Sequence, residues 1–402
     1  MLIYRVLISM VAPVVVVMTL FRVLRGREDW NALRGRFGGG HKARACPTWV
    51  HGASNGELAS ARRVIETLAQ AHSVLVTCNT VTARDMVRGW ANPDIIVQLA
   101  PIDLRWVISQ TIRRHDVKTL LVIENEIWPN RMAVAAKRDV QVILLGARLS
   151  TKSAAMWMRF RGVSQKVFAP VVGILPQDRG SAERFASLGV SKSMIGEITD
   201  LKPLAVKDAP KTVHPAFDRA ATILFASTHP GEEAALLAAF SLVREQHPDM
   251  RAILAPRHPR RATELRELAQ GHGFRVDQRS AGDDTAADVY LADTMGEMSH
   301  WFKAASVSFI GGSLVDKGGH TPYEPAAYGS TIIHGPHTSN FAGIYQQLDT
   351  EGGAAMAKTP EEIAAIILTH MSGSPMPEVA RRVVAPSQTI DEIVAQVRAM
   401  IG

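Results

Sequence analysis

The chain has 402 residues, 47% of them hydrophobic and 21% charged, which is enough for about two to three globular domains. Its net charge of +7 is spread along the sequence, and no nucleic-acid-binding module is visible. The two cysteines, Cys46 and Cys78, exclude a disulfide framework and a cysteine-based metal cluster and favour a reducing compartment.

The chain begins with an apolar stretch over residues 2–21. A membrane-spanning helix needs roughly 20 such residues, and no small-residue cleavage site follows, so residues 1–24 are predicted to be a retained anchor. Several arginines follow the stretch, which places the rest of the protein on the cytoplasmic side. Because Arg5 and Pro13 interrupt the apolar run, a helix that lies in the membrane interface is the alternative.

Residues 25–205 alternate short apolar runs with helical patterns, which favours a parallel α/β sheet and a first Rossmann-like domain. The runs that we expect to form strands are residues 74–77, 120–123, 142–145 and 167–172.

The first loop of this domain lies in residues 51–61, with the sequence H-G-A-S-N-G-E-L-A-S-A. Ser54 and Asn55 are good helix N-caps, and Gly56 permits a close approach to the backbone. The helix that follows should bury one face, formed by Leu58, Ala61, Ile65 and Leu68. Glu57, in its first turn, either complements the helix dipole or acts as a general base at the carboxyl end of a strand. The helix start should lower the pKa of Glu57, so a role as base would require closure of the cleft to raise it.

Three later loops of the first domain also carry polar side chains directly after a predicted strand. Glu124 and Glu126, after the strand predicted at residues 120–123, are either solvated or contact a polyol. Arg148, after the strand predicted at residues 142–145, can meet a carboxylate or phosphate. The candidates for the acceptor side are Ser54, Asn55, Gly56, Thr80, Arg84, Glu124, Glu126 and Arg148.

Prolines at 203, 210 and 215 mark a linker, and a second α/β series over residues 206–386 begins at Thr222. In residues 225–233, Pro230 is expected to lead a helix whose first turn holds two glutamates, so His229 and these acids are consistent with a purely structural role. Residues 254–261 form a basic loop in which Arg257 is either solvated or clamps a phosphate. The segment 387–402 is amphipathic and is expected to pack back on the first domain.

A glycine-rich stretch over residues 309–341 organises the second domain. A strand ends at Gly311 and Gly312, and a second glycine pair follows at 318–319. Pro322, Glu324 and Pro325 then open a short helix, with Pro325 suited to its first turn, and Gly329 ends it. One interpretation is purely structural: a tight αβ connection with an ordinary helix cap. A strand, a glycine loop and a helix N-terminus also make an anion site, and four polar side chains favour a ligand there: His320, Glu324, His337 and Asn340.

Taken in order, these loops resemble the Kdo transferases, which move 3-deoxy-D-manno-octulosonic acid (Kdo) in lipopolysaccharide assembly. The matching segments are R-G-R-F-G, S-N-G-E, E-N-E-I-W-P-N, A-R-L-S, A-S-T-H-P-G-E-E, P-R-H-P-R, D-T-M-G-E, G-G-S-L-V, G-G-H-T-P-Y-E-P-A and G-P-H-T-S-N-F. The sequence departs from the family pattern in three places. Asn55 stands where the family usually has a small or branched apolar residue, and Gly146 replaces an asparagine. The segment G-E-I-T-D, residues 196–200, replaces the family's G-N-L-K segment.

The resemblance implies a GT-B glycosyltransferase with two Rossmann-like domains facing a central cleft, anchored to the inner membrane. It would transfer Kdo from CMP-Kdo to a lipid A precursor (lipid IVA) with inversion, without a metal or other cofactor and without nucleic acid. Glu57 would be the general base. The residues that would line the donor site are Arg257, His258, Met295, Gly296, Glu297, Gly311, Gly312, His320, Glu324 and Asn340. The alternatives are a GT-B enzyme with another nucleotide sugar or acceptor, and a membrane-tethered, non-catalytic nucleotide-sugar-binding protein.

Overall fold

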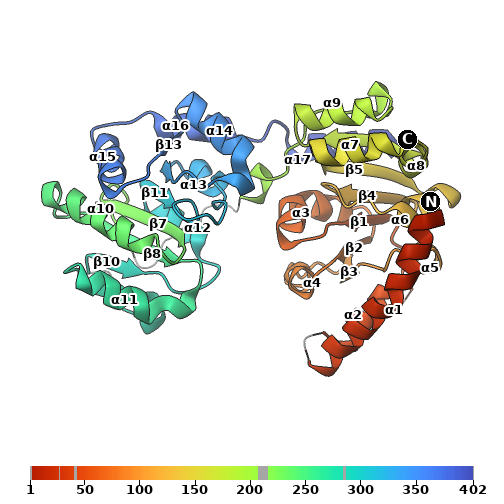
Figure 1. The fold of residues 1–402 in the computed structure, drawn as a ribbon, viewed down its shortest axis with the longest axis horizontal. Helices are drawn as coiled ribbons and strands as arrows, with labels where there is room; N and C mark the ends of the chain where they lie inside the picture. The colour runs from red at the N-terminus through yellow and green to blue at the C-terminus, as the bar shows by residue number, and fades with distance from the viewer. Residues whose placement is uncertain (1, 27, 40–42, 207–215, 284–286, 402) are drawn as a thin grey trace. The chain divides into compact units, whose positions relative to one another are not determined.

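The computed structural model describes residues 2–26, 28–39, 43–206, 216–283 and 287–401. The chain divides into two compact units, Met1–Ala205 with Pro386–Gly402, and Val206–Ala385, which are described separately below (Figure 1). Most of the predicted linker, residues 207–215, lies outside the described residues.

The first unit is built on a six-stranded sheet in the order β3-β2-β1-β4-β5-β6, and all its pairings are parallel. The strands are β1 (Thr48–His51), β2 (Val74–Cys78), β3 (Ile95–Leu99), β4 (Thr119–Ile123), β5 (Gln141–Ala147) and β6 (Val171–Pro176). The helices are α1 (Leu2–Leu24), α2 (Trp30–Arg36), α3 (Asn55–Ala69), α4 (Val81–Arg88), α5 (Arg105–His115), α6 (Pro129–Lys137), α7 (Thr151–Arg159), α8 (Arg161–Phe168), α9 (Arg179–Ser187) and α17 (Ile390–Ile401). The strand predicted at residues 167–172 is wrong at its start, because Val167 and Phe168 complete α8.

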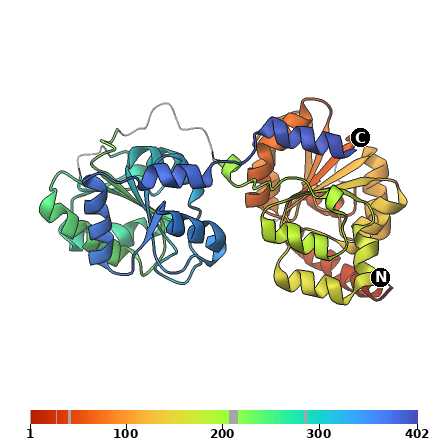
Figure 2. The same ribbon diagram turned by 90° about the horizontal axis from the view of Figure 1, so that it is seen from above.

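Helices cover both faces of this sheet, so successive strand residues enter two different cores (Figure 2). In β1, Trp49 packs into one core and Val50 into the other. The predicted apolar stripe of α3 is confirmed, since its four side chains are at most 3% exposed. The final helix α17 packs against α3 and adds Ile393 and Val397 to the same core.

The second unit is a seven-stranded sheet in the order β13-β12-β11-β7-β8-β10-β9, and its pairings are also parallel. The strands are β7 (Thr222–Thr228), β8 (Arg251–Pro256), β9 (Val276–Gln278), β10 (Val289–Leu291), β11 (Val307–Ile310), β12 (Thr331–His334) and β13 (Ala354–Met356). The helices are α10 (Glu233–Gln246), α11 (Ala262–Gly271), α12 (Met298–Ala304), α13 (Tyr323–Ala327), α14 (Ala342–Glu351), α15 (Pro360–Met371) and α16 (Met376–Val384). The helix predicted to be led by Pro230 begins only at Glu233.

Two parallel α/β sheets confirm the predicted fold class. In each sheet the strand order reverses beside the first strand of the unit, between β1 and β4 and between β7 and β11. The loops at the carboxyl ends of the strands on either side of such a reversal form the usual ligand-binding crevice of this architecture. In this chain those loops carry Glu57, Glu124, His229 and Gly312.

The apolar start of the chain forms helix α1, with Pro13 inside it. Its segment Val6–Leu24 is long and apolar enough to cross a membrane.

Candidate active site

Glu57 lies in the first turn of α3, just beyond the carboxyl end of β1. Ser54 is the N-cap, and its hydroxyl accepts the Glu57 backbone N–H at 3.3 Å. The Glu57 side chain turns back, so that its Oε2 accepts the Ala53 N–H at 2.5 Å and its Oε1 accepts the Ser54 hydroxyl at 3.3 Å. This reciprocal arrangement is a variant of the capping box in which the carboxylate accepts the N–H of the residue before the N-cap, so Glu57 has a structural role whatever its chemistry.

Burial raises the pKa of Glu57 from its ordinary 4.5 to about 7. The neighbouring carboxylates of Glu124 and Glu126 contribute to this rise, and the hydrogen bond from Ala53 opposes it. From the position at a helix start we expected a lowered pKa that only domain closure would correct. That expectation was wrong, because loss of water around the carboxyl group within the first unit outweighs the favourable helix terminus.

Glu126 has the opposite environment. The His51 ring, 3.7 Å from its Oε2, and the Trp128 indole N–H at 2.7 Å lower the pKa of Glu126 to about 2. The buried His51 itself has its pKa lowered to about 4, so its ring is neutral at pH 7. Two carboxyl groups with pKa values pushed apart typify acid–base sites. Here Glu57 exchanges a proton near neutral pH, and Glu126 stays charged.

Glu124 directly follows strand β4 and has a φ of 55°, a left-handed conformation that is uncommon outside glycine. Its backbone carbonyl accepts the N–H of Arg148 at 3.3 Å, which ties the loop after β4 to the loop after β5. The backbone of the exposed Arg148 therefore lies beside that of Glu124, and its contact with a ligand stays a prediction. Strained backbone of this kind is often found at functional sites.

Of the other candidates in the first unit, some lie in the loops near Glu57 and one is held in ion pairs instead. The Asn55 side chain accepts a hydrogen bond from Thr82 at 3.1 Å, and Thr80 caps α4. Gly56 is exposed beside Glu57 in the first turn of α3. Arg84, by contrast, is 5% exposed and pairs with Asp29 and Asp85, so the structure gives it a scaffold role.

In the second unit, the buried Glu232 holds the first glycine loop in place. Its carboxyl oxygens accept the backbone N–H groups of Gly312 at 2.7 Å, Ser313 at 3.0 Å and Leu314 at 2.9 Å, and that of His229 at 2.9 Å. The sequence assigned this residue to the first turn of a helix. Nothing in the local pattern indicated that it reaches a loop 80 residues further along the chain.

Four basic side chains gather around this loop. The rings of His229 and His320 are stacked 5.2 Å apart, with their Nε2 atoms 2.9 Å apart, and His258 meets His229 edge-on. Burial, together with the charges of His229 and Arg257, lowers the pKa of His320 to about 4. Arg257 is exposed at the end of β8, so one exposed cation and three imidazole rings lie next to backbone N–H groups.

The second glycine pair is shaped by Asn340, whose Nδ2 donates to the carbonyls of Lys317 at 3.0 Å and Gly319 at 3.3 Å. A Cβ at Gly318, which has a φ of 82°, would lie 2.6 Å from the Asn340 side chain. Similarly, a Cβ at Gly311 would lie 2.5 Å from the Ser227 carbonyl oxygen. Glu324 is half-buried in the first turn of α13.

The turn before α12 presents Met295, which is 68% exposed, and Gly296, with a φ of 87°. The Glu297 carboxylate accepts two hydrogen bonds from Arg279, at 3.2 and 2.8 Å, and another from Thr294. Glu297 therefore fixes the turn. Among the residues that the structure describes, no group of three or more His, Cys, Asp or Glu side chains is placed to hold a metal ion.

Residues 31–204 match the family described as 3-deoxy-D-manno-octulosonic-acid transferase (kdotransferase). A 3-deoxy-D-manno-octulosonic acid transferase of Haemophilus influenzae is 30% identical over 321 residues, which cover 76% of this chain and 75% of the relative. The chain belongs to the Kdo transferase family. A Bordetella pertussis Kdo transferase is also 30% identical, over 88% of this chain and 87% of its own.

Membership of the Kdo transferase family makes the protein a glycosyltransferase, as the resemblance implied. The fold is shared more widely. A putative UDP-N-acetylglucosamine 2-epimerase of Listeria monocytogenes, 13% identical, aligns over 90% of this chain and 96% of its own with a TM-score of 0.60. At this identity the likeness concerns the GT-B fold alone.

Two departures from the Kdo transferase pattern have structural explanations. Gly146 has a φ of 61°, a conformation that asparagine and glycine both tolerate well. In the segment 196–200 the glycine is retained, and two of the replaced residues, Glu197 and Thr199, form hydrogen bonds of 2.6 and 3.0 Å with Gln388, just ahead of α17. The segment 196–200 therefore contributes to the packing of α17 within the first unit.

Proposed function

We propose that this Kdo transferase moves Kdo from CMP-Kdo to lipid IVA, the lipid A precursor, with inversion of the anomeric centre, in lipopolysaccharide core biosynthesis. Its catalytic units face the cytoplasm at the inner membrane, to which the N-terminal stretch attaches them. The observation that carries the proposal is Glu57, a carboxyl group with its pKa raised to about 7 in a polar loop at the crevice of the first sheet.

In the proposed reaction the Glu57 carboxylate accepts the proton of the attacking lipid IVA hydroxyl. The hydroxyl oxygen bonds to the anomeric carbon of Kdo while the bond from that carbon to the CMP phosphate oxygen breaks, and CMP leaves with the electron pair. A base is most effective when its pKa lies near the operating pH. The charged Glu126, with its pKa near 2, raises the proton affinity of Glu57 and orients the loop through Trp128.

Negative charge develops on the phosphate of the leaving CMP, and preorganised donors stabilise such charge. The exposed Arg257 supplies a fixed positive charge and a bidentate fork. Its neighbour His258, the stacked pair His229 and His320, and the glycine loop add N–H donors. Glu324 is assigned to the ribose hydroxyls. With these groups the proposed mechanism requires no metal ion.

Hydroxyl and amide groups around Glu57, including Ser54, Asn55 and Thr80, together with Arg148, are proposed to meet the acceptor. Lipid IVA carries phosphates as well as sugar hydroxyls, which suits this mixture of neutral polar groups and one arginine.

The proposal is tested by incubating the detergent-solubilised protein with CMP-Kdo and lipid IVA and following the lipid by mass spectrometry. We expect lipid IVA to gain Kdo, and we expect calorimetry to show tighter binding of CMP than of UMP or GDP. Preference for UMP or GDP would indicate another nucleotide sugar. CMP binding without any lipid product would indicate a different acceptor or a non-catalytic binding protein.

A further inference from the structure

Helix α1 is attached to the first unit at its amino-terminal end as well as at its connection to α2. The Tyr4 hydroxyl donates a 2.8 Å hydrogen bond to Oδ2 of Asp103, a residue just ahead of α5. Further along α1, Ala12 is 8% and Thr19 4% exposed, so this face is covered by protein. Since a helix rises 1.5 Å per residue, about 27 Å separate Tyr4 from Arg22.

This attachment is incompatible with a helix that crosses the bilayer. A crossing would place Tyr4 on the far side of roughly 30 Å of hydrocarbon. Asp103 cannot follow it there, because its carboxylate is held inside the unit by the backbone N–H groups of Asn130 at 2.9 Å and Arg131 at 2.7 Å. Crossing would therefore break the Tyr4 hydrogen bond and uncover Ala12 and Thr19.

The opposite face of α1 is an exposed apolar stripe. Its members recur every three or four residues, and each is between 47% and 78% exposed. They are Val6, Leu7, Met10, Val11, Val14, Val17, Met18, Phe21 and Leu24. A helix that packs against protein on one side and lipid on the other is apolar all round, so its composition matches that of a spanning helix.

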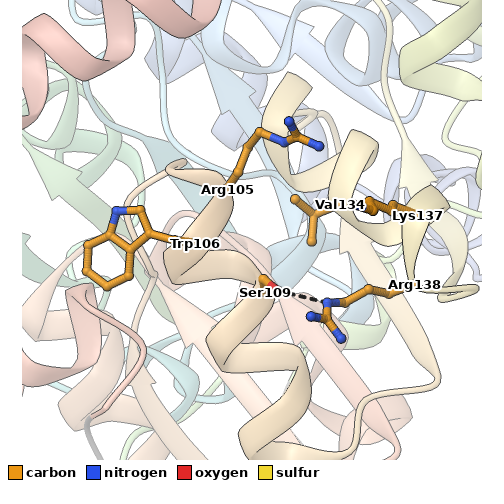
Figure 3. A pocket seen from close by; sticks show the side chains of 6 residues that line it. All are labelled: Arg105, Trp106, Ser109, Val134, Lys137 and Arg138. Carbon is orange, nitrogen blue, oxygen red and sulfur yellow. Dashed lines mark hydrogen bonds between the residues drawn. The ribbon is translucent and has the colours of Figure 1, made fainter.

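A basic pocket of about 510 Å³ lies between α5 and α6 and adjoins this region (Figure 3). Three of its six lining side chains are cationic and none is acidic: Arg105, Trp106, Ser109, Val134, Lys137 and Arg138. Trp106, 56% exposed, stacks on Phe37 at the end of α2, and Arg105 follows Asp103 by two residues. The pocket thus lies next to both ends of the α1–α2 segment.

We propose that the first unit sits on one leaflet of the membrane without crossing it. The apolar stripe of α1 enters the interface, as amphipathic surface helices do, and the basic pocket receives the phosphate of an anionic phospholipid headgroup. Trp106 lies at the rim, where tryptophan favours the boundary between water and lipid. Charge complementarity selects an anionic membrane as the occupant of this surface.

The first test compares the two ends of the full-length chain. Epitope tags are placed ahead of Met1 in one version and after Gly402 in another, and protease digestion is followed in intact spheroplasts and in inverted vesicles. A helix held on the unit keeps both tags on the same side of the membrane, so both are digested in the same preparation. Digestion of the two tags in opposite preparations overturns the proposal.

The second test measures vesicle binding of the full-length protein with phosphatidylglycerol or phosphatidylcholine. The pocket variant Arg105→Gln/Lys137→Gln is compared with a charge-matched control, Arg179→Gln/Lys192→Gln, on exposed residues outside the pocket. We expect the pocket variant to lose about 10-fold or more of the preference for phosphatidylglycerol, while the control stays near the parent. Equal losses in the two variants, or no loss in the pocket variant, overturn the proposal.

Discussion

Replacing Glu57 by glutamine should change the pH dependence of stability of the first unit. Below pH 4.5 the carboxyl group is protonated in both the folded and the unfolded chain, and well above pH 7 it is ionised in both. Between these values only the folded chain holds the proton, because its pKa is raised to about 7. Stability therefore falls as the pH rises through this window. The glutamine variant lacks this loss.

The difference between 4.5 and about 7 corresponds to a ceiling of about 3 kcal/mol at pH 8. Glu57 is only partly buried, so solvent screening reduces the ceiling, and we expect about 1–2 kcal/mol. Glu57→Gln should accordingly gain this much stability relative to the parent between pH 5 and pH 8. Glutamine still accepts the Ala53 N–H, so the capping geometry is retained.

The assay is urea unfolding followed by tryptophan fluorescence at both pH values. Six of the seven tryptophans lie in the first unit, so the signal reports mainly on that unit. Glu66→Gln, on the exposed side of the same helix, is the matched control and should follow the parent. A Glu57→Gln curve parallel to the parent, or a constant loss below about 1 kcal/mol, would leave Glu57 as a helix cap only.

Three further predictions concern the second unit and the chemistry. Arg257→Ala should weaken CMP binding by about one to two decades through the loss of charge-assisted hydrogen bonds, and Glu324→Gln should weaken it too; parental affinity in calorimetry for both would move the donor site elsewhere. Glu232→Ala should lower the unfolding free energy of the second unit by about 3 kcal/mol or more, because it leaves buried N–H groups without an acceptor. Thermal melting is the assay, and the control Glu245→Ala on α10 should melt like the parent. If Glu232→Ala also melted like the parent, Glu232 would not stabilise the glycine loop. EDTA should leave Kdo transfer unchanged; loss of activity restored by a divalent cation would contradict the metal-free mechanism.

The sequence predicted the two α/β series and most strands, because alternating apolar runs and glycine or proline boundaries are local signals. The helix start at Ser54 and the short helix closed by Gly329 were confirmed for the same reason. The errors arose where tertiary packing decides. Val167 and Phe168 are apolar and were assigned to a strand, but they pack as the last turn of α8.

The site was less predictable, because its properties depend on residues distant in sequence. The raised pKa of Glu57 comes first from burial and then from Glu124 and Glu126, which only the pairing of β1 with β4 brings near. Glu232 showed a helix-start signature and no sign of its hydrogen bonds to residues 312–314. Arg84 followed a hydroxyl-rich loop and was assigned to the cleft, but the acidic residues Asp29 and Asp85 hold it in the scaffold.

The most direct test of Glu57 as the base is the rate of Kdo transfer to lipid IVA by Glu57→Gln, measured with CMP affinity and melting temperature on the same preparation. We expect CMP affinity near that of the parent, a folded protein, and transfer slower by about 10²–10⁴, the usual contribution of a positioned base. The parent rate should rise with pH to a plateau above pH 7, as the pKa of about 7 requires. Parental turnover in Glu57→Gln would contradict the role of Glu57 as the base.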